Sequence, residues 1–349
     1  MPAGAGRPGA LSGHRCRRIR ATCRPTRVTL AVLTPGLQTT LQDAGRPGLA
    51  HLGIGRAGAF DAPALCIANA LCGNPPATCA LEATLLGPTL RCDRDAWIAV
   101  TGAALTLRIN GTQCPTWAPV FVRAGSRIVL GPMRAGCRSY LAVRGGFGAA
   151  PVLGSRSTDL NAGIGPFNGC ALRAGDALAV GSIPGPALPT RAAKWQLDPR
   201  PWLRIDPDAP LRMLPGAHEG CLTDASRAAL FDAPFRIRTD SNRVGVRLAG
   251  PALAWQSPVE MISEGCIPGL VQLPPSGQPI ALGPEGPVSG GYPRLGQIAA
   301  VDLPRLAQLR PGATLRFTRC TLAEAVHALE RRTRALSHLA AAIATRLAQ

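Results

Sequence analysis

Glycine and proline make up about a fifth of this chain, and no other feature of the sequence constrains the fold as strongly. The 349 residues include 40 glycines and 34 prolines. Both residues interrupt helices and initiate turns, so this composition favours short strands joined by turns over long helices. Hydrophobic residues account for 46% of the chain and charged residues for 17%, which indicates a globular protein rather than a disordered one.

The hydrophobic pattern predicts two strand-rich parts, over residues 28–182 and 203–320, joined by a Pro-rich linker at 183–202. Apolar runs such as AWIAVTG and YLAVRGG end in turn residues, and Asn110-Gly111 in RINGTQ is a strong hairpin signal. We expect helices over 61–74, over 224–234 with Asp224 as the cap, and over 321–349, where Thr321 and Glu324 form a capping box. No internal repeat proves a tandem architecture.

Residues 1–27 contain no Asp or Glu and no continuous apolar stretch. They therefore lack the core of a signal peptide. They are Arg-rich and acid-poor, as in a mitochondrial transit peptide, but prolines and glycines interrupt any amphipathic helix. We interpret them as a disordered tail, or as the product of a start codon placed too far upstream.

The net charge of +18 does not indicate nucleic-acid binding. Lys194 is the only lysine among 38 basic residues, so the charge reflects a general replacement of lysine by arginine, and no basic stripe is interleaved with aromatic residues. No apolar run is long enough for a membrane span. The 12 cysteines show no CxxC spacing and the 5 histidines no metal-binding spacing. We expect free thiols, no metal and a cytoplasmic location.

Polar side chains gather at bends beside the predicted strands. In TTLQDAGRPG, residues 39–48, Gly45 and Gly48 allow a tight bend that carries Gln42, Asp43 and Arg46. A carboxylate and a guanidinium in such a frame brace a loop through charge-assisted hydrogen bonds, or they meet an amide and a carboxylate of a ligand. Taken singly, each cluster is compatible with a purely structural role.

Taken together and in order, these clusters resemble the family named for allophanate hydrolase subunit 2, a carboxyltransferase-type family. The resemblance covers residues from about 28 to about 317. The matching segments are TTLQDAGRPG, GAFD, ANALCGNP, LEATLLGPTL, VLGSRSTD, SNRVGVRLAGP, SEGCIPGLVQLPPSGQPI, GGYP and DLPRLAQLRPG. It implies a mainly β chain built from two tandem cyclophilin-like β-barrel domains with a few short helices and a C-terminal helix.

The resemblance also implies a function. Enzymes of this family act on planar amide-like groups, and the chain is most similar to the C subunit of an ATP-dependent 5-oxoprolinase, which works with subunits A and B on a lactam. The alternatives are a regulatory KipA-type protein that binds a kinase inhibitor, and the carboxyltransferase part of a biotin-dependent urea or amide carboxylase. The resemblance implies ATP as the cofactor of the complex, bound by this chain or by another subunit. The sequence contains no biotin attachment site.

Candidate substrate-binding residues follow from the same segments, and none of them is an identifiable nucleophile. Donors are needed for a developing oxyanion and for phosphate oxygens, and a cation for a substrate carboxylate. We expect Arg243, Glu264, Gln278 and Tyr292 to converge on one groove. The full set is Gln42, Asp43, Arg46, Asp61, Asn69, Glu82, Ser155, Arg156, Asp159, Arg243, Glu264, Gln272, Gln278, Tyr292 and Arg294.

One segment departs from the family pattern. Many members carry a run of polar residues before Gly-Gly-Tyr-Pro, whereas this chain reads PEGPVSGGYP. Glu285 stands where an Asp is usual, and Pro287 and Val288 replace polar residues. Proline also removes a backbone hydrogen-bond donor. We therefore expect this departure to affect either the activity or the choice of substrate.

Overall fold

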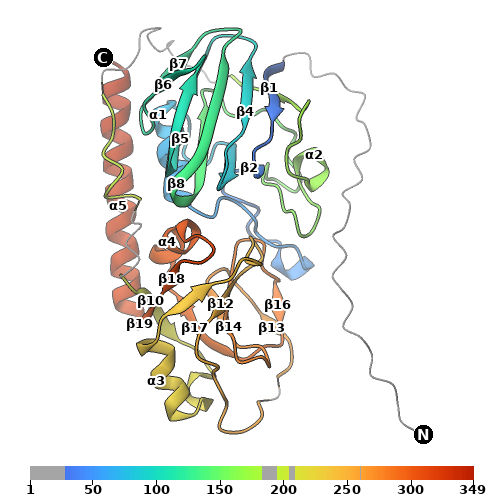
Figure 1. Ribbon diagram of the computed structural model, residues 1–349, viewed down its shortest axis with the longest axis vertical. Coiled ribbons are helices and arrows are strands. Elements are labelled where there is room, and N and C mark those ends of the chain that lie inside the picture. The colour runs from blue at the N-terminus through green and yellow to red at the C-terminus, as the bar shows by residue number, and fades with distance from the viewer. Residues whose placement is uncertain (1–27, 183–194, 204–208, 260) are drawn as a thin grey trace, which may run out of the picture.

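The first half of the chain forms one strongly curled sheet of nine strands (Figure 1). The structure is a computed structural model that describes residues 28–182, 195–203, 209–259 and 261–349. The order β2-β3-β8-β4-β1-β9 is extended by β5, which pairs with β8, β6 and β7. The strands are β1 (Val28–Thr34), β2 (Gln38–Gln42), β3 (Ala80–Thr84), β4 (Thr89–Cys92), β5 (Ala96–Ile109), β6 (Thr112–Cys114), β7 (Val120–Val122), β8 (Arg127–Val143) and β9 (Ala177–Ala179).

A second sheet of eight strands follows in the order β18-β11-β12-β15-β14-β17-β10-β19, together with a two-stranded ribbon of β13 and β16. Its only parallel pair in the described residues is β10 with β19. The strands are β10 (Leu211–Pro215), β11 (Phe235–Ile237), β12 (Gly245–Ala249), β13 (Glu264–Gly265), β14 (Leu270–Gln272), β15 (Ile280–Leu282), β16 (Ser289–Gly290), β17 (Arg294–Ile298), β18 (Thr314–Leu315) and β19 (Phe317–Arg319). The prediction of a mainly β chain with two tandem barrel-like sheets is confirmed.

The helices are few, and most are short. They are α1 (Ala62–Leu71), α2 (Pro166–Gly169), α3 (Asp224–Asp232), α4 (Leu303–Gln308) and α5 (Leu322–Leu347), with 3-10 turns η1 (Ala50–Leu52), η2 (Glu219–Cys221) and η3 (Ala300–Asp302). None of the described helices is both long enough and apolar enough to cross a membrane.

Local sequence signals account for several element boundaries. Asn110 and Gly111 adopt φ angles of 51° and 85° and connect β5 to β6, as a two-residue hairpin turn requires. Thr321 accepts from the backbone N–H of Glu324, whose side chain accepts in return from the Thr321 N–H, so the predicted capping box is present. The cap of α3 is one residue earlier than predicted: the Thr223 hydroxyl accepts the N–H of Ser226, and Asp224 lies in the first turn.

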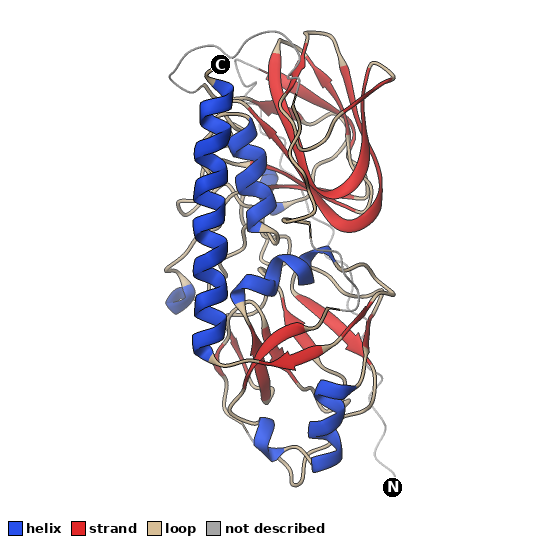
Figure 2. Cartoon of the chain, turned by 90° about the vertical axis from the view of Figure 1, so that its left-hand side faces the viewer, coloured by secondary structure: helices blue, strands red, loops and turns tan. Residues whose placement is uncertain are grey.

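Helix α5 runs along both sheets and ties them together (Figures 1 and 2). Its first turns bury Ala325 and Ala328 against Ala299 and Val301 beside the second sheet. Its later turns pack on α1 of the first half through Leu336, Leu339, Ile343 and Leu347. The helix therefore belongs to two cores at once.

Several sequence predictions fall wholly or partly outside the described residues. The tail at 1–27 and most of the linker, 183–194, are among them. The end of the predicted linker is packed, because Trp195, Leu197 and Trp202 join the core around α1. Nine of the described cysteines are free thiols, as predicted for these positions.

Candidate functional site

The bend after β2 is braced by Asp43. Its Oδ1 accepts hydrogen bonds from the hydroxyls of Ser155 and Ser157, both at 2.6 Å, and from the N–H of Gly45 at 2.8 Å. Its Oδ2 accepts the N–H of Arg156 at 2.6 Å. A carboxylate with this many donors is committed to holding two loops together, and the side chains of Ser155 and Ser157 are committed with it.

The other two side chains of the bend point into the protein. Gln42 is fully buried and donates to the backbone carbonyl of Thr158 at 2.9 Å. Arg46 is 2% exposed and donates through Nη2 to the carbonyl of Ser157. Burial lowers the pKa of Arg46, and the neighbouring carboxylates, of which Asp159 has the largest influence, oppose this shift.

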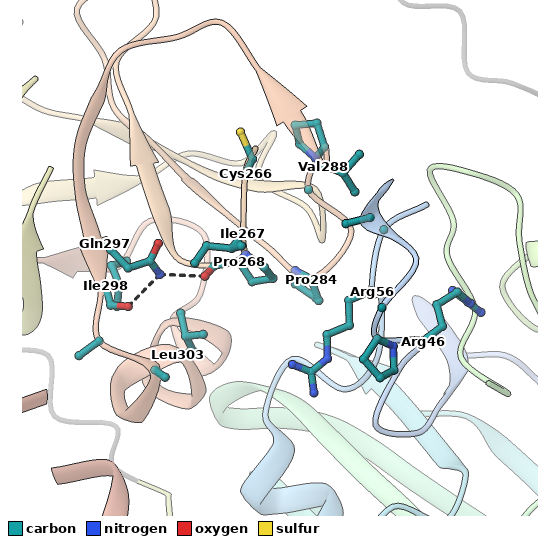
Figure 3. Close-up of a pocket in the computed structure, with 18 of the residues that line it drawn as sticks. Arg46, Arg56, Cys266, Ile267, Pro268, Pro284, Val288, Gln297, Ile298 and Leu303 are labelled. Carbon is teal, nitrogen blue, oxygen red and sulfur yellow. Dashed lines mark hydrogen bonds between the residues drawn. The ribbon is translucent and has the colours of Figure 1, made fainter. Parts of the chain in front are cut away.

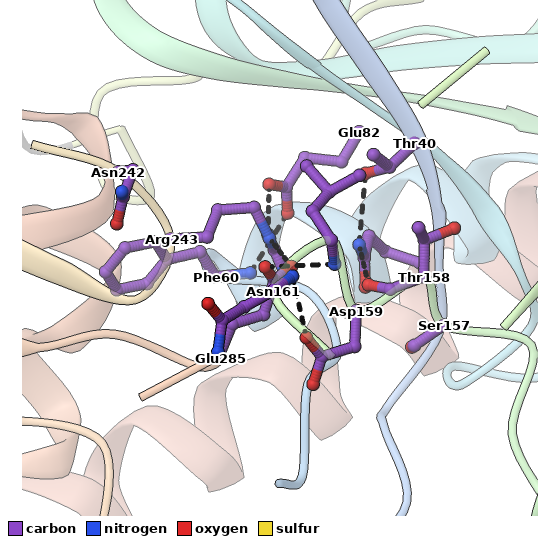
Figure 4. A network of polar contacts seen from close by, with 12 residues as sticks. Thr40, Phe60, Glu82, Ser157, Thr158, Asp159, Asn161, Asn242, Arg243 and Glu285 are labelled. Carbon is purple, nitrogen blue, oxygen red and sulfur yellow. Dashed lines mark hydrogen bonds and ion pairs between the residues drawn. The ribbon is translucent and has the colours of Figure 1, made fainter. Parts of the chain in front are cut away.

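A buried ion-pair network joins the two halves of the chain (Figure 4). Arg243, in the loop before β12, donates through Nη1 to Glu82 of β3 and through Nε to Glu285 at 2.5 Å. Its Nη2 donates to the carbonyl of Gly58 at 2.6 Å. Although burial works against its charge, Glu82 and Glu285 raise the pKa of Arg243 above its ordinary value. All three charged side chains are at most 3% exposed.

Glu82 is the most heavily bonded member of this network. It accepts the N–H of Phe60 at 3.0 Å and the hydroxyl of Tyr140 at 2.7 Å, and Arg138 lies 3.5 Å away. Burial alone would raise its pKa, but Arg243 and Arg138 hold the pKa of Glu82 below its ordinary value. Glu82 is therefore an ionised buried anchor rather than a proton donor.

Asp61 and Asn69 shape the first helix. Asp61 caps α1 through the N–H of Ala64 and accepts Nε2 of Gln308, from α4 in the second half, at 2.7 Å. Burial raises the pKa of Asp61 to about 6. Asn69 donates to the carbonyls of Pro76 and Thr78 and so fixes the turn after the helix.

The candidates from the second half do not gather with Arg243. Glu264 forms an ion pair with Arg294 at 2.7 Å. Gln278 bonds the backbone N–H and carbonyl of Gly250, and it lines a cavity of about 130 Å³ that it shares with Tyr292. The expected convergence of Arg243, Glu264, Gln278 and Tyr292 on one groove is wrong, because Arg243 is used to join the halves. Gln272 is buried and donates to the sulfur of Cys266 at 3.5 Å.

A cavity of about 560 Å³ lies between the two halves (Figure 3). The cavity is lined by three segments, 46–50, 266–268 and 284–288. These segments carry either the family resemblance or the departure from it. Glu285 is the exception within the third segment, because its side chain points away into the ion-pair network. Side chains of α5 close one side, among them Leu322, Val326 and Leu329. Pro287 and Val288, which replace polar residues of the family pattern, make part of its wall apolar.

A second cavity of about 350 Å³ shares Arg56, Pro268, Pro284 and Leu303 with the first, and Asp43 lies on its wall. Arg56 is exposed, and Figure 3 shows its guanidinium directed into the space between the halves. Sequence reasoning missed Arg56. It lies between the TTLQDAGRPG and GAFD segments in a glycine-rich stretch, the same signal that singled out Arg46.

The protein is therefore a two-part β protein with two curled sheets in tandem. A buried arginine joins the two parts, and the candidate site is the cavity at their junction. Residues 52–319 match the family model described as "Carboxyltransferase domain, subdomain A and B". The chain belongs to this family, and the resemblance seen in the sequence is confirmed.

The relatives agree with this assignment. The chain is 38% identical over 311 residues to the C subunit of 5-oxoprolinase from Escherichia coli (strain K12), covering 89% of this chain and 97% of that protein. It is 34% identical over 288 residues to the C subunit of 5-oxoprolinase from Haemophilus influenzae, covering 82% and 90%. The crystal structure of the Kluyveromyces lactis urea amidolyase is similar with a TM-score of 0.82 and 28% identity, over 91% of this chain but only 20% of that one.

Proposed function

We propose that this chain is the C subunit of an ATP-dependent 5-oxoprolinase, an assembly that opens the lactam ring of 5-oxo-L-proline to give L-glutamate. The observation that carries the proposal is the match to proteins of that name over nearly their whole length. The position of the cavity supports it, because family segments from both halves line a space large enough for a small lactam.

The proposed reaction explains why ATP and partner subunits are needed. A lactam carbonyl is a poor electrophile, and transfer of a phosphoryl group from ATP to its oxygen releases ADP and activates the carbonyl carbon. One water then adds to that carbon and the C–N bond breaks, which leaves an acyl phosphate. A second water releases phosphate from it and gives glutamate. We propose that subunits A and B complete the site and that the assembly binds ATP, hydrolyses it and works in the cytoplasm.

A second candidate is the carboxyltransferase part of a urea or amide carboxylase. The similarity to the urea amidolyase structure favours it, and urea is also a planar amide. In that case biotin would arrive on another chain, because Lys194 is the only lysine here and no biotin attachment sequence surrounds it. A KipA-type regulatory protein would use the same surface to bind a partner without turnover.

The experiment is co-expression of this chain with its candidate A and B subunits, followed by co-purification and an assay for glutamate and ADP. We expect glutamate formation from 5-oxo-L-proline and ATP by the assembly, and none by this chain alone or by A and B without it. Turnover by the single chain would overturn the subunit assignment. Bicarbonate-dependent ATP hydrolysis with urea, and none with 5-oxo-L-proline, would favour the carboxylase.

A further inference from the structure

The cavity of about 560 Å³ between the two halves, here the junction cavity, has an apolar wall that the chain itself leaves uncovered. Leu322, Val326 and Leu329 line it at helical spacing, so they form one edge of α5. Ile267 lines the cavity as well. These four side chains are between 41% and 67% exposed. Single exposed leucines are common, but several large apolar side chains gathered in one cavity indicate a binding site.

The size of the junction cavity exceeds what free 5-oxo-L-proline fills. A cavity of about 150 Å³ is enough for benzene, and this lactam is about half again as large as benzene. The junction cavity, at about 560 Å³, therefore holds more than twice the volume of 5-oxo-L-proline, and it lies in the range of about 300–1,000 Å³ that larger organic ligands occupy. A small, polar lactam would also leave the apolar edge of α5 in contact with water.

One cation faces this apolar wall. Among the described residues that line the junction cavity, the charged ones are Arg46 and Arg56. The guanidinium of Arg46 points away from the cavity, toward the carbonyl of Ser157 (Figure 3). Arg56 is exposed, and within the described residues it makes only a long bond of 3.4 Å, from Nε to the carbonyl of Ala44. A single guanidinium matches one carboxylate, which it binds through two parallel hydrogen bonds.

The position of Arg56 relative to α5 limits how the ligand is built. Arg56 and Leu329 line the junction cavity and also the second cavity of about 350 Å³, so both residues lie where the two spaces meet. We therefore expect the carboxylate and the apolar group of the ligand to be close neighbours. An amino acid with an aliphatic side chain has this arrangement, because both groups are attached to one carbon atom.

We propose that the site accepts 5-oxo-L-proline joined through its carboxyl group to an aliphatic amino acid, as in 5-oxo-L-prolyl-L-leucine. The leucine side chain of this ligand packs on Val326 and Leu329, and its carboxylate binds Arg56. The proposal rests on the proposed function and deepens it, because it extends the substrate class from a free lactam acid to a lactam that carries an apolar residue. The same bonds break: the ring C–N bond opens, the peptide bond stays intact, and the dipeptide, ATP and two waters give L-glutamyl-L-leucine, ADP and phosphate.

Three ligands separate the two contacts. 5-Oxo-L-prolyl-L-leucine carries both groups, 5-oxo-L-prolylglycine lacks the aliphatic side chain, and 5-oxo-L-prolyl-L-leucinamide lacks the carboxylate. Isothermal titration calorimetry with the full chain measures each Kd. We expect the wild type to bind the leucine dipeptide at least about tenfold more tightly than the glycine dipeptide, the scale of burying most of a leucine side chain. We expect a similar factor over the amide, the scale of one charged hydrogen-bonded pair.

Two variants assign these preferences to residues. Arg56→Gln removes the charge of an exposed side chain, so affinity for the leucine dipeptide should fall about tenfold, to that of the amide, while binding of the amide is unchanged. Val326→Thr keeps the shape of a half-exposed side chain and replaces a methyl group by a hydroxyl, so it should weaken binding of the leucine dipeptide by about threefold and leave the glycine dipeptide unaffected. Arg123→Gln is the matched control and should equal the wild type, because Arg123 is exposed but lines neither cavity.

Equal affinities for the leucine and glycine dipeptides, or binding of neither by the wild-type chain, would overturn the inference and leave the apolar edge to a partner subunit. An Arg56→Gln chain that still prefers the acid to the amide would overturn it too.

The assay of the assembly separates this inference from the proposed function. We expect L-glutamyl-L-leucine and ADP from the leucine dipeptide, and an assembly that opens only free 5-oxo-L-proline would contradict the inference while the proposed function stands. If the assembly opens neither lactam but the chain still prefers the leucine dipeptide through Arg56, the proposed function fails and the binding site stands.

Discussion

Replacing Arg243 by methionine tests whether the junction of the two halves depends on one buried cation. The variant removes the donors to Glu82 and Glu285 and the 2.6 Å bond to the Gly58 carbonyl, at a side chain that is 3% exposed. Glu82 keeps other donors, including the Tyr140 hydroxyl. Within the described residues, Glu285 keeps only the N–H of Leu160, at 3.1 Å. Removing one partner of a buried ion pair costs about 3–5 kcal/mol, and we expect a loss of this size.

The pH dependence of that loss follows from Glu285. Burial already raises its pKa, with Arg243 acting in the opposite direction, so the pKa rises further in Arg243→Met. A carboxyl group with a higher pKa in the folded state than in the unfolded state lowers the free energy of unfolding when the pH is above both values. This destabilisation disappears when the pH is below both values. The deficit should therefore be largest near about pH 8 and smaller near about pH 5.

Urea unfolding of wild type and variant across this pH range measures the effect. Arg247→Met is the control, because Arg247 is half-exposed and reaches Asp240 only at 3.8 Å, and exposed pairs contribute about 0–1 kcal/mol. A loss below about 1 kcal/mol for Arg243→Met, or a loss that does not change with pH, would refute the reasoning.

The remaining predictions concern Asp61 and the bend after β2. Because burial raises the pKa of Asp61 from 3.8 to about 6, the folded state binds its proton more tightly, and the free energy of unfolding falls as the pH rises through this window. Relative to Asp61→Asn, the wild type should lose about 3 kcal/mol between about pH 3 and about pH 8 in urea titrations; parallel curves would contradict this. Gly45→Ala should cost well over about 1 kcal/mol, because φ is 83° and an added Cβ would meet backbone oxygens at 2.5 and 2.9 Å. Gly48→Ala, at φ 85° with nothing within 4 Å, should cost about 1 kcal/mol, and equal losses in thermal unfolding would show that the close approach does not matter.

The fold was predictable because its signals are local. Asn110-Gly111 specifies a hairpin within two residues, and Thr321 with Glu324 specifies a helix start within four. The misplaced cap of α3 is an error of one position between Thr223 and Asp224, two residues with similar capping ability.

The site was predictable only in part, because its partners are far apart in the sequence. Arg243 meets a glutamate 161 residues away, and Asp43 meets serine hydroxyls 112 and 114 residues away. Nothing in a local pattern distinguishes an arginine that joins two halves from one that faces a ligand.

The double attachment of α5 has a consequence for synthesis of the chain. The helix begins at Leu322, whereas α1, on which its later turns pack, ends at Leu71. At about 5–20 residues per second, the ribosome needs roughly 12 to 50 s to translate the intervening stretch. During that time the first sheet emerges with the apolar face of α1 lacking its final cover. The pace of translation therefore sets how long this apolar face waits for its cover.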